Sequence, residues 1–405
     1  GVMRKRSIVI IAIVWMVVLV AGVSSAITMA VCGRLPGEGL GVTERGRSER
    51  YARLDEVRLR MEEHYVEKPD EEALMLGAIR GMLASVEDPY TFYYTREEMD
   101  ALSRRSLGLY DGVGLLVSAD KAGHVRVLRV FAGSPAYEAG VRVGDRITAV
   151  NGHPVSGKNQ QTLDEAVERM KSNPQQLLKL EILRGEELLT LGMVCSTIHM
   201  ERVEYRMLDK KVGYLAIYEF IGDDVEAFRS GIQALKRQGA DKIIIDLRSN
   251  PGGMLEDVVQ IADSLMGEGM IAYTQDRYGN RSEYFSAASR WEVEIAVLVN
   301  GMTASAGEIL AGALQDTGTA LIVGEQTFGK GIVQTVYTFP EDGAGMQLTT
   351  ARYYTPSGRS IHGVGIKPDI KVSLDAEHEI LSGEVDLLSD NQLYAAYEAL
   401  LKKTE

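Results

Sequence analysis

A serine and a lysine stand in two short segments that contain glycine. Ser305 begins a Ser-Ala-Gly-Glu sequence that is typical of the start of a helix, with Glu308 three residues further on. Lys330 follows Gly329 and lies between two β-like runs. A lysine that accepts the proton of a serine hydroxyl makes the serine a nucleophile, and such pairs are a known variant of the serine–histidine arrangement. The two segments together therefore indicate a hydrolase.

Each residue of the pair also has an ordinary structural interpretation. Ser305 alone could be a helix cap without chemistry, although a helix N-terminus with its unpaired N–H groups would also stabilise an oxyanion. Lys330 could be a solvated surface lysine, yet its apolar and glycine neighbours indicate partial burial, which lowers the pKa of an amine. The segments alone leave both choices open.

The lysine segment from Gly324 to Lys330 also copies the first seven positions of a phosphate-binding loop. Gly331 stands where that loop needs a serine or threonine, and residues 332–339 have a β-pattern where a helix is required. Both departures argue against nucleotide binding. On such a strand Gln334 would share a face with Lys330, where its amide could hold the amine, although any polar residue on a strand face would look the same.

A second glycine-containing loop, Asn250 to Gly253, follows an apolar strand. Glycine lets the backbone come close to a ligand and direct N–H groups at an anion. An ordinary tight turn would have the same sequence.

Composition excludes several other classes of function. The 405 residues carry 57 acidic and 44 basic side chains, a net charge of -13, so clustered basic charge for nucleic acid is not expected. Two cysteines, Cys32 and Cys195, and six scattered histidines show no metal-ligand spacing and no disulfide framework. We therefore expect neither a catalytic metal nor another cofactor.

One N-terminal segment has the composition of a membrane helix. Residues 7–32 carry no charge and follow Arg4-Lys5-Arg6, which predicts a single bilayer-spanning helix with its basic flank in the cytoplasm. The rest of the chain would then lie on the extracytoplasmic side of the cell membrane. A cleaved signal peptide is the alternative.

The remaining sequence predicts an α/β multidomain protein, in which a β-rich domain is inserted between a helical segment and an α/β core. Alternating strands and helices in the core favour a layered sheet with parallel strands, whose ends collect ligands. The predicted parts are the anchor (1–32), a linker (33–47), a helical region (48–106), the β-rich domain (107–196), the α/β core (197–385) and a helical tail (386–405).

From about residue 50 to 375 the chain resembles the carboxyl-terminal processing proteases, also called tail-specific proteases. The motifs that carry the resemblance are specific as a set, although each alone is weak. The matching segments are Asp88-Pro89-Tyr90, Gly112-Val113-Gly114-Leu115, Ser134-Pro135-Ala136, Gly144-Asp145, Val150-Asn151-Gly152, residues 246–253, Ser305-Ala306-x-Glu308 and residues 327–334.

The resemblance implies a serine endopeptidase. Ser305 would be its nucleophile, Lys330 its general base and Gln334 the residue that orients the lysine. The N–H groups of Gly253 and Ala306 would form the oxyanion hole. Some members of the family use an acidic residue as an additional partner, and in this chain Asp316 is the candidate, ranked below Gln334.

The resemblance also makes residues 107–196 a PDZ-like domain. Its carboxylate-binding loop would be Gly112-Val113-Gly114-Leu115, and its partners would be protein or peptide substrates with exposed C-termini. An inactive PDZ-type adaptor is the alternative function, and a PDZ-like domain that binds nothing is the alternative for the domain. The helical region and the helical tail could also build a homodimer.

Overall fold

The computed structural model describes residues 44–119, 122–158, 160–170, 175–199, 201–287, 291–375 and 387–402. The chain forms two compact units, one up to Met82 and the other from Leu83 onwards. The predicted membrane segment lies outside the described residues. Among those described, no helix combines the length and the apolar character that crossing a bilayer requires.

The first unit contains α2 (Glu44–His64) and most of α3 (Glu71–Ala84). Arg58 of α2 forms an ion pair with Glu71 at the start of α3. Apolar side chains on α2 such as Leu54 are exposed, and α3 has no buried residue. Dimerisation through this region stays a prediction.

The second unit begins with a short segment that contains β1 and α4, and a β-rich domain follows it. Strands β2 and β9 pair at the start and end of this domain, and a six-stranded antiparallel sheet with the order β3-β4-β5-β7-β8 lies between them, β6 pairing with β5. The elements are β1 (Phe92–Tyr94), α4 (Arg96–Ser106), β2 (Leu109–Gly112), β3 (Leu115–Ala119), β4 (Val125–Val130), α5 (Pro135–Glu138), β5 (Arg146–Val150), β6 (His153–Pro154), α6 (Gln160–Met170), β7 (Leu177–Arg184), β8 (Glu187–Val194) and β9 (Ser196–His199).

The core of the β-rich domain follows from the alternation of its strands. In β7 the side chains of Leu178, Leu180 and Ile182 are buried, while Leu177 and Lys179, which alternate with them, are exposed. This period of two puts one face of the sheet against apolar residues of α6.

The α/β core has a six-stranded sheet in the order β10-β11-β12-β15-β16-β19. Strands β11, β12, β15 and β16 run parallel, whereas β10 is antiparallel at one edge. Its elements are β10 (Val203–Met207), β11 (Val212–Ile217), α7 (Asp224–Arg237), β12 (Lys242–Asp246), α8 (Leu255–Leu265), β15 (Glu294–Val299), α9 (Ala306–Asp316), β16 (Ala320–Gly324), β19 (Ile370–Lys371) and α10 (Asn391–Lys402).

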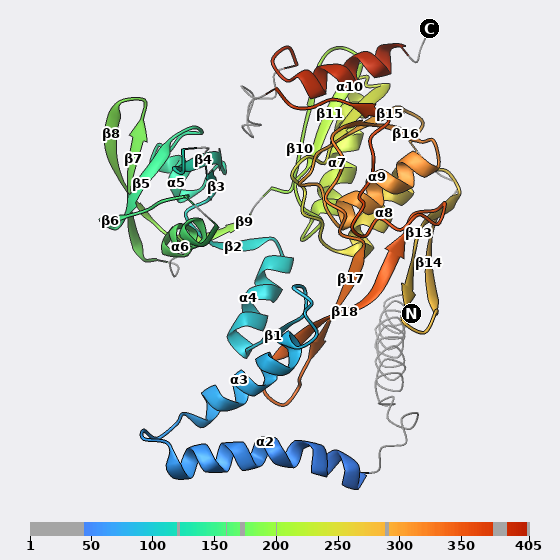
Figure 1. The fold of residues 1–405 in the computed structure, drawn as a ribbon. Coiled ribbons are helices and arrows are strands. Elements are labelled where there is room, and N and C mark those ends of the chain that lie inside the picture. Colours follow the sequence, from blue (N-terminus) through green and yellow to red (C-terminus); the bar gives the residue numbers. More distant parts are fainter. Residues whose placement is uncertain are drawn as a thin grey trace, which may run out of the picture. The chain divides into compact units, whose positions relative to one another are not determined.

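Helices cover both faces of this sheet, which is why its central strands contain consecutive apolar residues, Ile243–Ile245 in β12 and Ile295–Val299 in β15. Leu215 and Ile243 face a core that includes α7, α8 and α9, while their neighbours Tyr214 and Ile244 face a second core that includes α10. Figure 1 shows α10 across the sheet from the other three helices.

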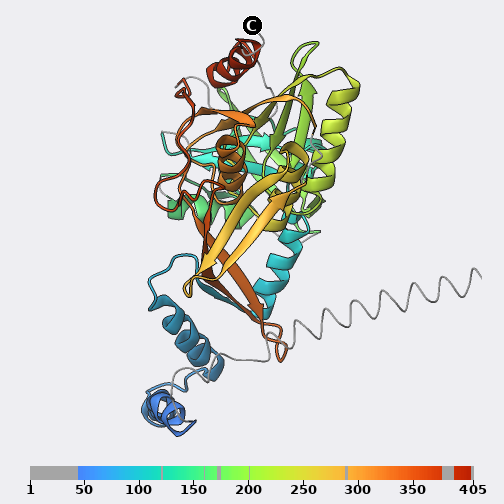
Figure 2. The same cartoon turned by 90° about the vertical axis from the view of Figure 1, so that its right-hand side faces the viewer.

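A second sheet is built from two long hairpins beside the core. Its order is β1-β18-β13-β14, with β17 on the other side of β18. Figure 2 shows the two hairpins side by side, and β13 pairs with β18 antiparallel. The strands are β13 (Gly269–Asp276), β14 (Arg281–Ser286), β17 (Ile332–Thr338) and β18 (Gly345–Tyr354).

Candidate active site

Three loops meet at one edge of the α/β sheet. They follow β12, β15 and β16, which are parallel neighbours, so their carboxyl ends lie together. The N–H of Ala304 donates to the carbonyl oxygen of Asn250 at 2.9 Å, and the N–H of Phe328 donates to that of Thr303 at 3.0 Å. These bonds join the Asn250–Gly253 loop, the Ser305 loop and the Lys330 loop at the strand ends where the sequence predicted a site.

Ser305 is the last loop residue before α9, so the predicted helix start is confirmed. Its φ of 52° and ψ of -117° lie outside the regions that L residues favour, at a cost on the order of 1–3 kcal/mol. The Ser305 carbonyl accepts hydrogen bonds from the N–H groups of Glu308 and Ile309 at 2.9 and 3.0 Å. The surroundings therefore hold a half-buried serine in a strained conformation at a helix N-terminus, as is common at functional sites.

The Glu308 carboxylate links the serine to the lysine loop. Its side chain is fully buried and accepts four hydrogen bonds. One oxygen, Oε2, accepts from the backbone N–H groups of both Ser305 and Lys330, at 3.0 and 2.8 Å. The other oxygen accepts from the Thr327 hydroxyl at 2.5 Å and the Gly329 N–H at 2.7 Å. The capping-box glutamate thus fixes two segments that are more than twenty residues apart.

A tyrosine on β18 contacts the same two residues from another side. The hydroxyl of Tyr353 lies 2.9 Å from the carbonyl oxygen of Ser305 and also contacts the carbonyl oxygen of Lys330. Burial raises the pKa of Tyr353 well above its usual value, and the nearby Glu308 raises it further, so the hydroxyl keeps its proton. With a single proton it donates to one carbonyl at a time.

The Lys330 ammonium lies in a setting that the sequence did not predict. Its Nζ is 4.3 Å from the centroid of the Tyr90 ring. Burial lowers the pKa of Lys330, and the Asp88 carboxylate opposes that effect by raising it. Asp88 and Tyr90 belong to the motif Asp88-Pro89-Tyr90, whose sequence gives no local sign of contact with Lys330.

The predicted alignment of Gln334 with Lys330 does not follow from simple alternation. β17 begins at Ile332, so Lys330 lies before the strand and the alternation of β17 does not extend to it. Beside Gln334 the pairing shifts register, because Val333 pairs with Ala351 and Gln334 with Thr349. The Gln334 amide instead donates to the Thr349 hydroxyl at 3.5 Å. Burial raises the pKa of Asp88, but hydrogen bonds, of which that from the Thr349 hydroxyl has the largest effect, outweigh burial and lower this pKa below its usual value.

Two glycines let the Asn250–Gly253 loop pack closely, Gly252 against Ser305 and Gly253 against Phe220. A Cβ on Gly252 would lie 2.7 Å from the Cβ of Ser305 and 2.9 Å from the nitrogen of Ala306. A Cβ on Gly253 would lie 2.1 Å from the carbonyl oxygen of Phe220. Phe220 and Gly253 form a parallel bridge, in which Phe220 bonds the carbonyl oxygen of Gly252 and the N–H of Met254. The N–H of Gly253 itself therefore points away from Phe220.

Asp316 lies at the opposite end of α9 from Ser305. The rise of a helix separates the two by about 16 Å. The Asp316 carboxylate pairs with Arg359 and accepts a hydrogen bond from the Ser357 N–H at 3.0 Å. These contacts tie the end of α9 to the loop after β18, and they do not place Asp316 beside the serine.

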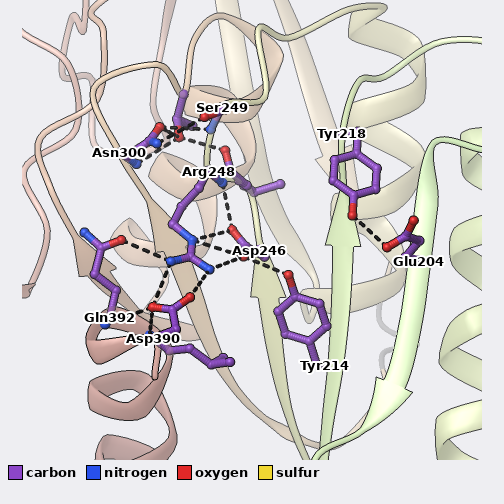
Figure 3. A network of polar contacts seen from close by, with 12 residues as sticks. Glu204, Tyr214, Tyr218, Asp246, Arg248, Ser249, Asn300, Asp390 and Gln392 are labelled. Carbon is purple, nitrogen blue, oxygen red and sulfur yellow. Dashed lines mark hydrogen bonds and ion pairs between the residues drawn. The ribbon is translucent and has the colours of Figure 1, made fainter. Parts of the chain in front are cut away.

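An ion pair precedes the Asn250–Gly253 loop (Figure 3). The guanidinium of Arg248 binds Asp246 through Nη2 at 2.6 Å, and the Tyr214 hydroxyl donates to the same carboxylate at 2.8 Å. Ser249 has φ 59°, and its N–H donates to the Asn300 side chain at 2.9 Å. The motif residues Asp246 and Arg248 therefore support the loop from within the fold.

In the β-rich domain, residues Gly112 to Leu115 form the connection from β2 to β3. The carbonyl oxygens of Val113 and Gly114 accept from the N–H groups of Ala136 and Phe131, at 2.9 and 3.1 Å. Gly114 has φ 81°, and a Cβ there would lie 2.2 Å from the Cβ of Ser134. The loop thus packs closely against the Ser134 turn.

Metal binding has no candidate in these segments. Within the described ranges, no group of three or more His, Cys, Asp or Glu side chains has the arrangement of a metal site.

The Asp88→Asn variant should lower the pKa of Lys330. Asp88 raises that pKa while burial lowers it, so removing the carboxylate leaves the effect of burial unopposed. Titration of protein labelled with 13C at lysine Cε, assigned with Lys330→Arg, measures the change. Asp100→Asn on the exposed side of α4 is the control, and a Lys330 pKa that rises or stays constant would contradict the expectation.

The Glu308→Gln variant should lose about 2–4 kcal/mol of unfolding free energy, because an amide nitrogen cannot accept the hydrogen bonds that one carboxylate oxygen receives. Urea unfolding measures the loss, and amide exchange should quicken in residues 327–331. Exposed Glu341→Gln is the control for removing one negative charge. Equal stability of the two variants would contradict the role of the Glu308 carboxylate in holding the Ser305 and Lys330 segments together.

Three models of protein families match most of the described residues. A model of peptidase family S41 matches residues 211–372, and a model of PDZ domains matches residues 126–184. A model of the N-terminal domain of the activating protease CtpB matches residues 41–98.

Comparison with whole proteins extends the match to most of the chain. It is 37% identical over 338 residues to a carboxy-terminal-processing protease of Bartonella bacilliformis, covering 81% of this chain and 76% of that protein. It is 32% identical over 363 residues to the carboxy-terminal processing protease CtpA of Bacillus subtilis, covering 89% and 77%. A solved structure, the photosystem II D1 C-terminal processing protease, is 30% identical with a TM-score of 0.54, covering 78% of this chain and 86% of that chain. The chain therefore belongs to peptidase family S41, as a PDZ-containing serine peptidase of the carboxyl-terminal processing type.

Proposed function

We propose that the chain is an endopeptidase that cleaves protein substrates through an acyl-enzyme on Ser305, with Lys330 as the general base. The observation that carries the proposal is the Glu308 carboxylate, which bonds the backbone of the serine and that of the lysine through one oxygen atom. A carboxylate that bonds both backbones fixes the position of the segment that carries the nucleophile relative to the segment that carries the base.

In the proposed reaction the Ser305 hydroxyl oxygen attacks the peptide carbonyl carbon while Lys330 Nζ accepts the hydroxyl proton. The tetrahedral intermediate then expels the amine, which takes that proton from Lys330. A water molecule next gives a proton to Lys330 and attacks the ester carbon. The bond between that carbon and the Ser305 oxygen then breaks, the carboxylic acid product leaves, and Lys330 returns the proton to Ser305. Burial favours this cycle because it lowers the pKa of Lys330 and so increases the fraction of neutral amine.

The proposed oxyanion hole is formed by the N–H groups of Gly253 and Ala306. Ala306 is the first residue of α9, so its N–H belongs to the unpaired set at the helix N-terminus, where negative charge is favoured. Gly253 is exposed, and the parallel bridge to Phe220 leaves its own N–H for a ligand. Both would act on charge that develops at the carbonyl oxygen.

In this proposal Gln334 orients Lys330 through intermediate residues. Its amide bonds to Thr349, and Thr349 bonds to Asp88, whose carboxylate lies in the electrostatic environment of the lysine. A direct contact between amide and amine is not required.

We further propose that the PDZ domain captures the C-terminal tail of the substrate. β3 is the edge strand of its sheet and α6 packs beside it, so an extended peptide could add as a further strand between them. The loop Gly112-Val113-Gly114-Leu115 begins that strand and would bind the terminal carboxylate through backbone N–H groups. Membership of a peptidase family argues against the alternative of an inactive adaptor.

The N-terminal apolar segment bears on where the protein is located in the cell. We propose that residues 7–32 anchor the protein in the cell membrane with its catalytic part outside the cytoplasm, because this charge-free run follows three basic residues. The full chain should resist carbonate extraction from membranes, whereas a chain beginning at Gly33 should be released. Extraction of the full chain would contradict the anchor.

Cleavage of a protein with an apolar C-terminal tail tests the mechanism. Wild type should cleave it, while Ser305→Ala and Lys330→Ala should each lower kcat by at least about a thousandfold, since removal of a nucleophile or its base has effects of this size. Gln334→Ala should lower it less. Wild-type turnover by Ser305→Ala would remove the serine from the mechanism.

A second arm of the same assay tests tail recognition. Peptides with a free C-terminus and with a C-terminal amide should differ in KM more than in kcat, because the amide removes the charge that the PDZ loop would bind. Equal KM values would contradict tail capture while leaving the serine–lysine mechanism intact.

A further inference from the structure

Arg248 lies two residues before the Asn250–Gly253 loop, and its guanidinium is held between two carboxylates (Figure 3). Asp246 is on the same strand end and binds Nη2 at 2.6 Å. Asp390 is far away in sequence and binds Nη2 at 2.8 Å and Nη1 at 3.1 Å. The Arg248 side chain is only 2% exposed, so both ion pairs are shielded from water.

Asp390 and Gln392 bring this contact from the start of α10. Oδ1 of Asp390 accepts from the N–H groups of Gln392 and Leu393 at 3.1 and 2.9 Å, so the residue also caps the helix. The Gln392 oxygen accepts from Arg248 Nη1 at 3.2 Å, and its amide donates to the Val372 carbonyl at 2.8 Å. One end of the helix is therefore fastened to the guanidinium.

The apolar face of α10 keeps this end of the helix in place. Leu393, Ala396 and Leu400 are fully buried in the core that lines one face of the α/β sheet. Asp390 is thus presented by a packed element, and its carboxylate reaches Arg248 without a mobile connection.

Beyond Arg248 the chain enters a strained turn that leads into the loop. Ser249 has φ 59°, which is costly for a residue with a side chain. The Asn250 side chain is fully buried, accepts from the Gly252 N–H at 2.8 Å and donates to the Ile217 carbonyl at 2.8 Å. The backbone thus leads from Arg248 through the Ser249 turn to Gly252 and Gly253 within five residues.

We propose that Asp390 and Gln392 are positioning residues for the reaction: by fixing Arg248 they hold the Ser249 turn, and with it the Gly253 N–H, in the geometry that the oxyanion requires. The docked α10 is then part of the catalytic apparatus. This inference rests on the proposed function, because the role of Gly253 in the oxyanion hole belongs to it.

Charge decides the strength of this connection. Burial alone would lower the pKa of Arg248, but Asp246 and Asp390 outweigh burial and raise it, so the guanidinium stays charged. Hydrogen bonds between ionised groups are the strong ones, and two carboxylates fix a planar guanidinium in orientation as well as in position.

The test compares kcat and KM for a tailed peptide in full-length variants. Asp390→Asn keeps the helix cap and removes the charge, whereas Asp390→Ala removes both. We expect kcat to fall about tenfold in the first and further in the second, with KM changed less than about twofold, since the oxyanion contact acts in the transition state. Glu398→Gln, which breaks the exposed pair with Lys402 on the same helix, should leave both constants unchanged.

Amide hydrogen exchange on the same proteins separates positioning from a general loss of stability. Asp390→Asn should quicken exchange in residues 249–254 and leave residues 178–182 of the PDZ domain and 306–314 of α9 unchanged. An unaltered kcat, or exchange that rises uniformly through the core, would overturn the inference. If wild type cleaves nothing, the proposed function fails, and the exchange measurement alone decides whether Asp390 holds the loop.

Discussion

A buried carboxylate, that of Glu308, is the constraint on which the site depends. Removing a charge from water is costly unless hydrogen bonds replace its hydration, and Glu308 receives four of them. Because three of the donors belong to residues 327–330, the loop after β16 must wrap onto the first turn of α9. The positions of the Ser305 and Lys330 backbones relative to each other follow from that requirement.

The second sheet completes what the carboxylate begins. β18 supplies the Tyr353 hydroxyl, which contacts the carbonyl oxygens of Ser305 and Lys330, and Thr349, which connects Gln334 with Asp88. The lysine side chain therefore lies among groups from several parts of the chain, while its backbone is held by α9. Its lowered pKa is a consequence of this burial, only partly opposed by Asp88.

Local patterns in the sequence were sufficient for much of the fold. The apolar run that became β12, the alternation in β7 and the Ser-Ala-Gly-Glu start of α9 are signals contained within a few residues. Strand β18 was not predicted, because its sequence mixes glycine, threonine, glutamine and arginine and is stabilised by pairing on both sides.

At the site, the sequence identified residues but not their long-range contacts. Glu308 was seen as a helix cap, since the donors at Thr327, Gly329 and Lys330 become visible only when the loop folds back. The register shift beside Gln334 comes from its pairing partner β18, which a local pattern in residues 330–334 does not reveal. The neighbourhood of Asp88, Tyr90 and Lys330 joins segments about 240 residues apart, beyond any local pattern. Asp390 likewise meets Arg248 only through the packing of α10.

The most direct test of the account is covalent labelling of the wild-type protein with a serine-reactive fluorophosphonate, with the modified residue located by peptide mass spectrometry. Ser305 should carry the single adduct. The labelling rate should rise with pH as Lys330 loses its proton, and it should collapse in Lys330→Ala. Labelling of another serine, or an unchanged rate in the lysine variant, would contradict the serine–lysine assignment.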